Sequence, residues 1–346
     1  MSEESVKTGA ETKPPSYGRQ RIGVAVTLVC GLALAIVFSI SGEAPPRQQA
    51  LAPVPQQDRT VEKSTPVQIN SNTTERLTEQ FDRLGYTLEA VQKGSMDVPR
   101  VLPDDVPHNF NDMQDAKERK KLFLRMMLPL VLVINDSILE TRDRIQSYQE
   151  LLEAGKTLAV RDQLWLDERF KEYKVENRDF DALIKRVDIV PASLALAQAA
   201  VESGWGTSRF AREGNALFGQ WTWSKNAADG IVPEKRAEGK THMIKSFRAP
   251  VDAVASYFRN LNTHRAYRGL RNIRASMRGK DTTITGTALA EGLESYSEKG
   301  YEYVELIRQI IRTNQLGPLD EAVLAPTRPD LPRITSSDRI SDDVRG

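Results

Sequence analysis

Glu202 has the sequence setting best suited to acid–base chemistry. The preceding run, PASLALAQAAVESGWG, predicts a helix that starts at Pro191 and is capped at Gly204, so the carboxyl lies in the last helical turn. There the negative end of the helix dipole disfavours a carboxylate, and Ala199 and Trp205 are expected to shield it from water. Both effects favour a protonated acid, which is what protonation of a glycosidic oxygen requires. From these residues alone, an exposed glutamate in an Ala-rich helix is an equally good interpretation.

Aromatic residues follow Glu202 closely in the sequence. Sugar rings are apolar on their C–H faces, and aromatic rings offer them a flat contact surface. Trp221 and Trp223 alternate along an expected strand, so they would share one face and form a sugar platform. For Trp205 a buried core position is at least as good an interpretation, and Asn215 is expected to cap or to hydrogen-bond near the cleft floor. The aromatic candidates for substrate binding are Trp205, Phe218, Trp221 and Trp223.

The elements that must position these residues are mainly helical. Residues 116–152 carry apolar positions at helical spacing, which predicts a core-facing stripe, and Pro129 predicts two helices or one bent helix there. Residues 219–247 differ, because short alternating runs between turn residues predict a small β-hairpin lobe. A helical domain with one inserted lobe indicates a mainly α, lysozyme-like architecture. Further helices are expected at 158–173, 180–187, 191–202, 250–262, 283–293 and 299–313.

The composition argues against two classes of function. Lys and Arg total 48 against 47 for Asp and Glu, so the charge gives no reason to expect a nucleic-acid partner. Cys30 is the only cysteine and lies in an apolar run, so neither a disulfide framework nor a thiolate metal site is expected. The three histidines are scattered without a metal-ligand spacing.

Two motifs carry a resemblance to a known family. The run AQAAVESGWG at 197–206, followed by NALFG at 215–219, resembles the glucosaminidase domains of glycoside hydrolase family 73, which includes flagellar peptidoglycan hydrolases. The similarity covers about residues 187–316. It implies a lysozyme-like fold, the β-1,4-linked glycan strands of peptidoglycan as substrate, and cleavage after N-acetylglucosamine without a metal or organic cofactor. The motif glutamate, here Glu202, is then the catalytic acid.

The resemblance also implies a second carboxylate on the hairpin lobe. Its match is Glu234, thirteen positions before Phe247, although Asp229 and Glu238 lie on the same lobe. The separation of the two carboxylates is not readable from the sequence, so inverting and retaining chemistry both remain open.

A tyrosine-containing segment near the domain's end departs from the usual family pattern. Tyr296 matches the first family tyrosine, whose phenol would lie across the cleft from the acid. Tyr303 best matches the second and is a further substrate-binding candidate, although a core position at the start of the last helix is the favoured interpretation.

The remaining segments predict a membrane-tethered protein. Residues 22–41 are long and apolar enough to cross a bilayer, and basic residues precede them, so residues 1–21 are expected in the cytoplasm. The catalytic domain would then lie in the periplasm or cell envelope, with a single-pass anchor in the inner membrane. A cleaved signal peptide is the alternative.

The order of segments follows from composition. Residues 42–72 are rich in Pro and Gln and predict a linker, 187–316 form the glucosaminidase domain, and 317–346 predict a disordered tail. Residues 73–186 are a helical extension that either packs on the domain or binds an envelope partner, packing being the default.

Three other functions stay open at this stage. A lytic transglycosylase or a muramidase of the same fold is the enzymatic alternative, and the lobe carboxylate argues against the transglycosylase. A non-catalytic peptidoglycan-binding scaffold of the envelope is the alternative from a different class.

Overall fold

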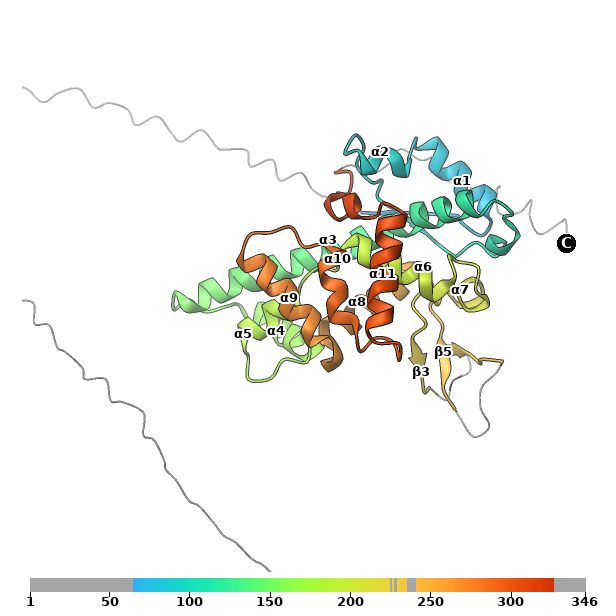
Figure 1. Ribbon diagram of the computed structural model, residues 1–346. Helices are drawn as coiled ribbons and strands as arrows, with labels where there is room; N and C mark the ends of the chain where they lie inside the picture. Colours follow the sequence, from blue (N-terminus) through green and yellow to red (C-terminus); the bar gives the residue numbers. More distant parts are fainter. Residues whose placement is uncertain (1–64, 225, 227–228, 235–240, 327–346) are drawn as a thin grey trace, which may run out of the picture. The chain divides into compact units, whose positions relative to one another are not determined.

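The computed structural model describes residues 65–224, 226, 229–234 and 241–326 (Figure 1). Every described residue belongs to one compact unit. The predicted cytoplasmic segment 1–21, the predicted membrane segment 22–41 and most of the predicted linker lie outside the described residues.

The longest element is helix α3, Ala116–Glu153. The side chain of Asp115 caps its start by accepting hydrogen bonds from the backbone N–H groups of Lys117 and Glu118, at 2.7 and 3.2 Å. Of the two possibilities predicted at Pro129, two separate helices are not observed, because the helix continues through the proline, which is buried within it. The predicted core stripe is confirmed at Leu122, which is buried with its neighbours on the same face.

Length and composition alone would allow α3 to cross a membrane. It is the one helix among the described residues with this property, and most of its apolar window is buried within the protein. It packs against α6, Ala192–Ser203, and α8, Pro250–Thr263. Helix α3 is therefore the core helix of the folded unit.

The other helices surround this core. Those that were predicted lie close to their predicted ranges, whereas the helices Arg209–Gly214 and Arg268–Gly279 were not predicted. Helix α6 also packs against α11 (Tyr301–Thr313) and α10 (Gly286–Leu289), and α9 (Arg268–Gly279) packs against a 3₁₀ turn, η4 (Ala290–Leu293). The predicted helix 283–293 divides into α10 and η4. The remaining helices are α1 Thr74–Arg83, α2 Leu88–Gln92, α4 Val160–Glu172, α5 Phe180–Arg186, α7 Arg209–Gly214, α9 Arg268–Gly279, α10 Gly286–Leu289 and α11 Tyr301–Thr313, with 3₁₀ turns η1 Phe110–Asp112, η3 Arg265–Tyr267, η4 Ala290–Leu293 and η5 Gly317–Glu321.

The predicted lobe is present as a three-stranded antiparallel sheet rather than a simple hairpin. Its strands are β3 (Trp221–Thr222), β4 (Gly230–Ile231) and β5 (Met243–Lys245), in the order β3-β5-β4. Gly230 permits the close pairing, because a Cβ there would lie 2.7 Å from the carbonyl oxygen of Ile244. The sheet lies below α6 and α7 in Figure 1, and β4 packs against α7.

The structure corrects part of the predicted linker, 42–72, and part of the predicted disordered tail, 317–346. Strand β1, Val67–Ile69, falls within the predicted linker, yet it pairs in parallel with β2, Val101–Pro103, and Ile69 is buried. At the other end, Leu319 of η5 is buried and Leu324 forms a bridge with Val98. Residues 65–72 and 317–326 are therefore packed parts of the fold.

The predicted extension and the predicted catalytic domain share one hydrophobic core. Buried residues of α1 and α3 belong to the same cluster as those of α6, α8 and α11. Of the two possibilities for the extension, packing on the domain is the one observed.

Candidate active site

Helix α6 places Glu202 one residue before its end, as the sequence predicts. Its start is fixed by Asp320 of η5, whose carboxylate accepts hydrogen bonds from the Ser193 backbone N–H and hydroxyl, both at 2.8 Å. Its end is fixed by Gly204, which adopts the left-handed conformation with φ of 59°. Both ends of the helix that carries the acid are thus set by specific residues.

The Glu202 carboxyl is half-buried and has one hydrogen-bond donor among the described residues. The Tyr303 hydroxyl of α11 donates to Glu202 Oε1 at 2.7 Å. The other oxygen, Oε2, faces Gly219, where a Cβ would lie 3.5 Å away. Burial raises the pKa of Glu202 above its ordinary value, and the hydrogen bond from Tyr303 opposes this rise in part. The net effect favours the protonated form that a general acid needs.

A group of tyrosines packs behind this carboxyl. The ring of Tyr296 stacks on that of Tyr303, with centroids 5.3 Å apart and planes inclined by 10°. The Tyr296 hydroxyl donates to the carbonyl oxygen of Phe218 at 3.2 Å. Burial raises the pKa of both phenols, so they remain neutral donors. Tyr296 therefore lies beside Tyr303, and its hydroxyl donates to the loop at Phe218 rather than to Glu202.

Two residues that the sequence analysis did not select complete these hydrogen bonds. Gln198 Nε2 donates to the Tyr303 hydroxyl oxygen at 3.0 Å, and the Tyr257 hydroxyl donates to Gln198 Oε1. Gln198 precedes Glu202 by four residues, so it lies on the same face of α6, and this spacing could have revealed it. Tyr257 comes from α8, and no local pattern places it here.

Asn215 and Phe218 are buried, at 4% and 3% exposure, which takes both side chains away from the surface that a glycan strand would contact. Asn215 ends α7 in the left-handed conformation, and its Nδ2 donates to Asp105 Oδ1 at 2.8 Å while its Oδ1 accepts from the Val106 N–H at 3.0 Å. Phe218 stacks on Tyr257, with centroids 3.9 Å apart. Both position the loop that faces Glu202, and Asn215 fastens it to the extension.

Trp205 is directed onto α3. Its ring lies edge-on to Phe123, with centroids 6.0 Å apart, and the Lys120 ammonium group lies 4.9 Å from its centre. The expectation that Trp205 shields Glu202 is therefore not supported, and the core interpretation fits its position. The observed contact of the carboxyl is instead with the Tyr303 hydroxyl, and Gly219 lies beside its other oxygen.

The two lobe tryptophans are exposed, as a sugar platform requires. Trp221 is 52% exposed and Trp223 is 70% exposed. The Trp221 ring lies against His242, with centroids 4.0 Å apart. These rings offer an accessible aromatic surface on the lobe that follows Gly219.

Glu234 lies at the α7 side of the lobe. Its side chain is 81% exposed, and Oε1 lies 3.4 Å from Nε of Arg209. Arg209 also pairs with Glu213, at 3.2 Å. The structure therefore brings Glu234 to Arg209 rather than into the hydrogen-bond network of Glu202.

Two other lobe carboxylates, Asp229 and Glu238, were also noted in the sequence. Asp229 accepts hydrogen bonds within its own turn, from Asn226 Nδ2 at 3.3 Å and from the Ser224 hydroxyl. Glu238 lies outside the described residues. Within the described part of the chain, no group of three His, Cys, Asp or Glu side chains is placed to hold a metal ion.

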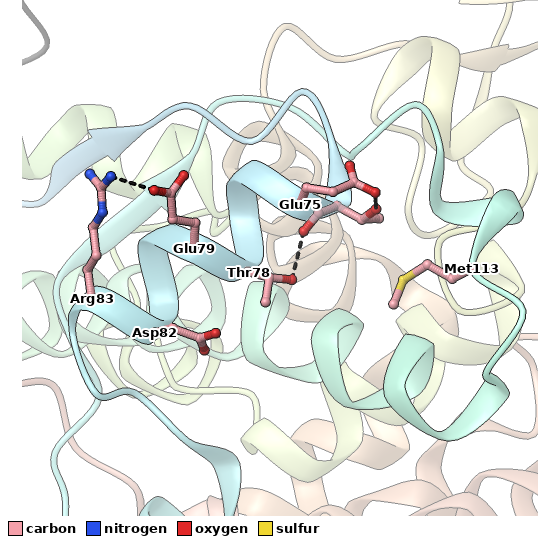
Figure 2. Close-up of a pocket in the computed structure, with 7 residues that line it drawn as sticks. Glu75, Thr78, Glu79, Asp82, Arg83 and Met113 are labelled. Atoms are coloured by element: carbon pink, nitrogen blue, oxygen red, sulfur yellow. Dashed lines mark hydrogen bonds and ion pairs between the residues drawn. The ribbon is translucent and has the colours of Figure 1, made fainter.

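A large cavity of about 770 Å³ lies elsewhere, along α1 (Figure 2). Apart from Met113, its lining residues all belong to α1, and Figure 2 shows the ion pair between Arg83 and Glu79 at its edge. The residues around Glu202 are not part of it.

Comparison with known proteins gives matches to a family and to individual chains. The Glucosaminidase family model, described as mannosyl-glycoprotein endo-beta-N-acetylglucosaminidase, matches residues 177–316. The chain is similar to Protein bax of Escherichia coli (strain K12), with 34% identity over 236 residues that cover 66% of this chain and 78% of that protein. A solved structure, the catalytic domain of the autolysin Auto from Listeria monocytogenes, matches at 16% identity with a TM-score of 0.29, covering 50% of this chain and 96% of that one.

The family match contains every candidate site residue and begins ten residues before the predicted boundary at 187. The matched range includes both sequence motifs and the small sheet. The chain belongs to the glucosaminidase family of glycoside hydrolases, family 73, together with its Bax relative.

Proposed function

We propose that the protein is an endo-β-N-acetylglucosaminidase that cleaves the β-1,4 bond after N-acetylglucosamine in peptidoglycan, with Glu202 as the general acid. The observation that carries this proposal is the half-buried carboxyl at the end of α6, whose pKa is raised by burial and whose Oε1 accepts a hydrogen bond from Tyr303. Membership of the glucosaminidase family supports the reaction class.

In the proposed reaction Glu202 gives its proton to the glycosidic oxygen as the bond from that oxygen to C1 breaks. The departing sugar leaves with a free hydroxyl group. Water supplies the oxygen that bonds to C1 and keeps one of its protons there. Its other proton passes to Glu202 directly, or to the second carboxylate, and in that case proton exchange with solvent reprotonates Glu202. The reaction consumes one water molecule and regenerates the acid.

Glu234 is the candidate for the second carboxylate. It is accessible and held beside Arg209, as a group on a substrate-facing lobe should be. Either as a base that activates water or as a nucleophile toward C1, it would be used in its ionised form.

Trp221 and Trp223 are the candidate sugar platform. Their exposed rings follow directly after the loop that faces Glu202 Oε2, so a strand stacked on them would run from the lobe toward the acid. Peptidoglycan as substrate agrees with the predicted single-pass anchor at 22–41 and with a catalytic domain in the periplasm or cell envelope.

The test is to digest purified peptidoglycan with the full chain and identify the new glycan ends by mass spectrometry, with Glu202→Gln in parallel. New reducing N-acetylglucosamine ends that vanish in the variant are the expected result. Reducing N-acetylmuramic ends would replace the proposal with a muramidase, and anhydro ends would replace it with a lytic transglycosylase. Binding without cleavage by folded wild-type protein would replace it with a scaffold function.

A further inference from the structure

Behind Glu202 a chain of hydrogen bonds crosses three helices. It runs from Tyr257 of α8 to Gln198 of α6, then to Tyr303 of α11, and ends at Glu202. Gln198 and Tyr257 are fully buried and Tyr303 is 3% exposed. Such a buried network is stabilising when its polar atoms are paired, and here every side-chain polar atom of Gln198, Tyr257 and Tyr303 has at least one partner.

The direction of each bond follows from the chemistry of its groups. The Tyr257 hydroxyl donates to Gln198 Oε1, which fixes the orientation of the amide and turns its NH₂ group toward Tyr303. The Tyr303 oxygen accepts that N–H at 3.0 Å. Its own hydrogen then has Glu202 Oε1 as its acceptor among the described residues.

The consequence concerns the two oxygens of Glu202. Because Oε1 accepts a hydrogen bond from Tyr303, the acidic proton belongs on Oε2. Oε2 faces Gly219, which has a φ of 58° and no side chain to cover it. This is the side of the loop that leads directly to Trp221 and the lobe.

We propose that Gln198 and Tyr257 are positioning residues for catalysis: they fix Tyr303 as a donor to Glu202 Oε1 and so direct the catalytic proton from Oε2 toward the lobe. This inference rests on the proposed role of Glu202 as the acid. Neither residue touches the substrate.

Tyr257→Phe tests the inference because it removes one hydroxyl and retains the ring that stacks on Phe218. Without that donor the Gln198 amide is free to turn its oxygen toward Tyr303, which draws the Tyr303 hydrogen away from Glu202. We expect kcat on soluble peptidoglycan fragments to fall about tenfold with KM unchanged. Since the bond from Tyr303 lowers the pKa of Glu202, its loss should move the alkaline limb of kcat/KM to higher pH.

Gln198→Met is the second variant. It retains the length of the side chain and removes both of its hydrogen bonds. Tyr303 then keeps Glu202 as its acceptor but is a weaker donor to it, so the same limb should shift in the same direction by a smaller amount. The matched control is Tyr86→Phe, which removes a fully buried hydroxyl that has no hydrogen-bond partner among the described residues. It should leave both kcat and the pH profile unchanged.

All rates are measured on the full chain and divided by the folded fraction from circular dichroism. Tyr257→Phe and Gln198→Met profiles that superimpose on wild type would overturn the inference, as would a loss of stability with an unchanged rate per folded molecule. The Glu202→Gln variant distinguishes a failure of this inference from a failure of the proposed function. If that variant is inactive while the profiles do not shift, only the positioning role fails; if it remains active, the proposed function fails first.

Discussion

Glu202 and Glu234, the two carboxylates assigned to the site, lie in contrasting surroundings. Glu202 is half-buried at a helix end and belongs to a hydrogen-bond network drawn from three helices. Glu234 is 81% exposed on the small sheet and is paired with Arg209. Burial raises the pKa of Glu202 and favours its neutral acid, whereas Glu234 lies at the surface beside a cation. The contrast teaches that one fold can give two carboxyl groups different environments, which is what the two roles proposed for them in glycoside hydrolysis would require.

The largest expected effect is the loss of activity on substitution of the half-buried Glu202. Glu202→Gln retains the acceptor for Tyr303 but has no proton to donate, so kcat should fall by about 10³-fold or more. In wild type, kcat/KM should decline as pH rises through the raised pKa of Glu202, because the acid is then ionised. Steady-state rates on peptidoglycan fragments across pH measure both.

The same variant has a stability control. A folded-state pKa above the unfolded value means that protonation stabilises the fold at low pH and that this contribution is lost as pH rises through the folded pKa. Glu202→Gln should therefore be at least as stable as wild type at neutral pH. A marked loss of stability would attribute its inactivity to unfolding.

The next largest effect is expected on substitution of the exposed Glu234. Glu234→Gln should lower kcat by about 10²-fold if the second carboxylate acts as base or nucleophile. Glu213→Gln is the matched control, because Glu213 pairs with the same Arg209 at 3.2 Å and has no assigned role. Equal rates for the two variants would remove Glu234 from the mechanism.

A smaller effect is expected from the aromatic surface of the lobe. Trp221→Ala and Trp223→Ala should each raise KM about tenfold with little change in kcat, because a lost stacking contact weakens binding of substrate and transition state alike. Tyr301→Ala removes a ring that is 54% exposed outside the lobe and serves as the control. A fall in kcat at constant KM would contradict a platform role.

The smallest effect concerns the far end of the helix that carries the acid. Asp320 accepts from Ser193 and from the Gly286 N–H at 2.9 Å, so it caps both α6 and α10. Asp320→Ala should lower the free energy of unfolding by about 1–2 kcal/mol without changing the rate per folded molecule. Urea titration measures this, with Glu321→Ala as the neighbouring control. No change would show that α6 needs no such cap.

Local sequence signals were sufficient for the helix that positions the acid. The run from Pro191 to Gly204 predicted α6 almost to the residue, because helix formers, a start and a glycine cap all lie within it. The mainly helical fold with a small β lobe was predicted as well, since both depend on short-range periodicity.

Features that depend on distant partners were not predictable in this way. Strand β1 was taken for linker because it is stabilised by pairing with β2, which lies 34 residues further along the chain at Val67↔Val101. The position of Trp205 was left open by the sequence, because its packing against Phe123 of α3 depends on a residue 82 positions away. Tyr257 escaped notice because its partner, Gln198, lies 59 positions away.

The central claim is that Glu202 is protonated where an ordinary glutamate is not, and its pKa can be measured directly. The full chain labelled with ¹³C at the glutamate side-chain carboxyl is titrated by NMR, and Glu202→Gln identifies the signal by its loss. The account predicts a titration midpoint clearly above the ordinary value of 4.5. A midpoint at or below that value would contradict it, because the residue would then be ionised at neutral pH and would have no proton to give to the glycosidic oxygen.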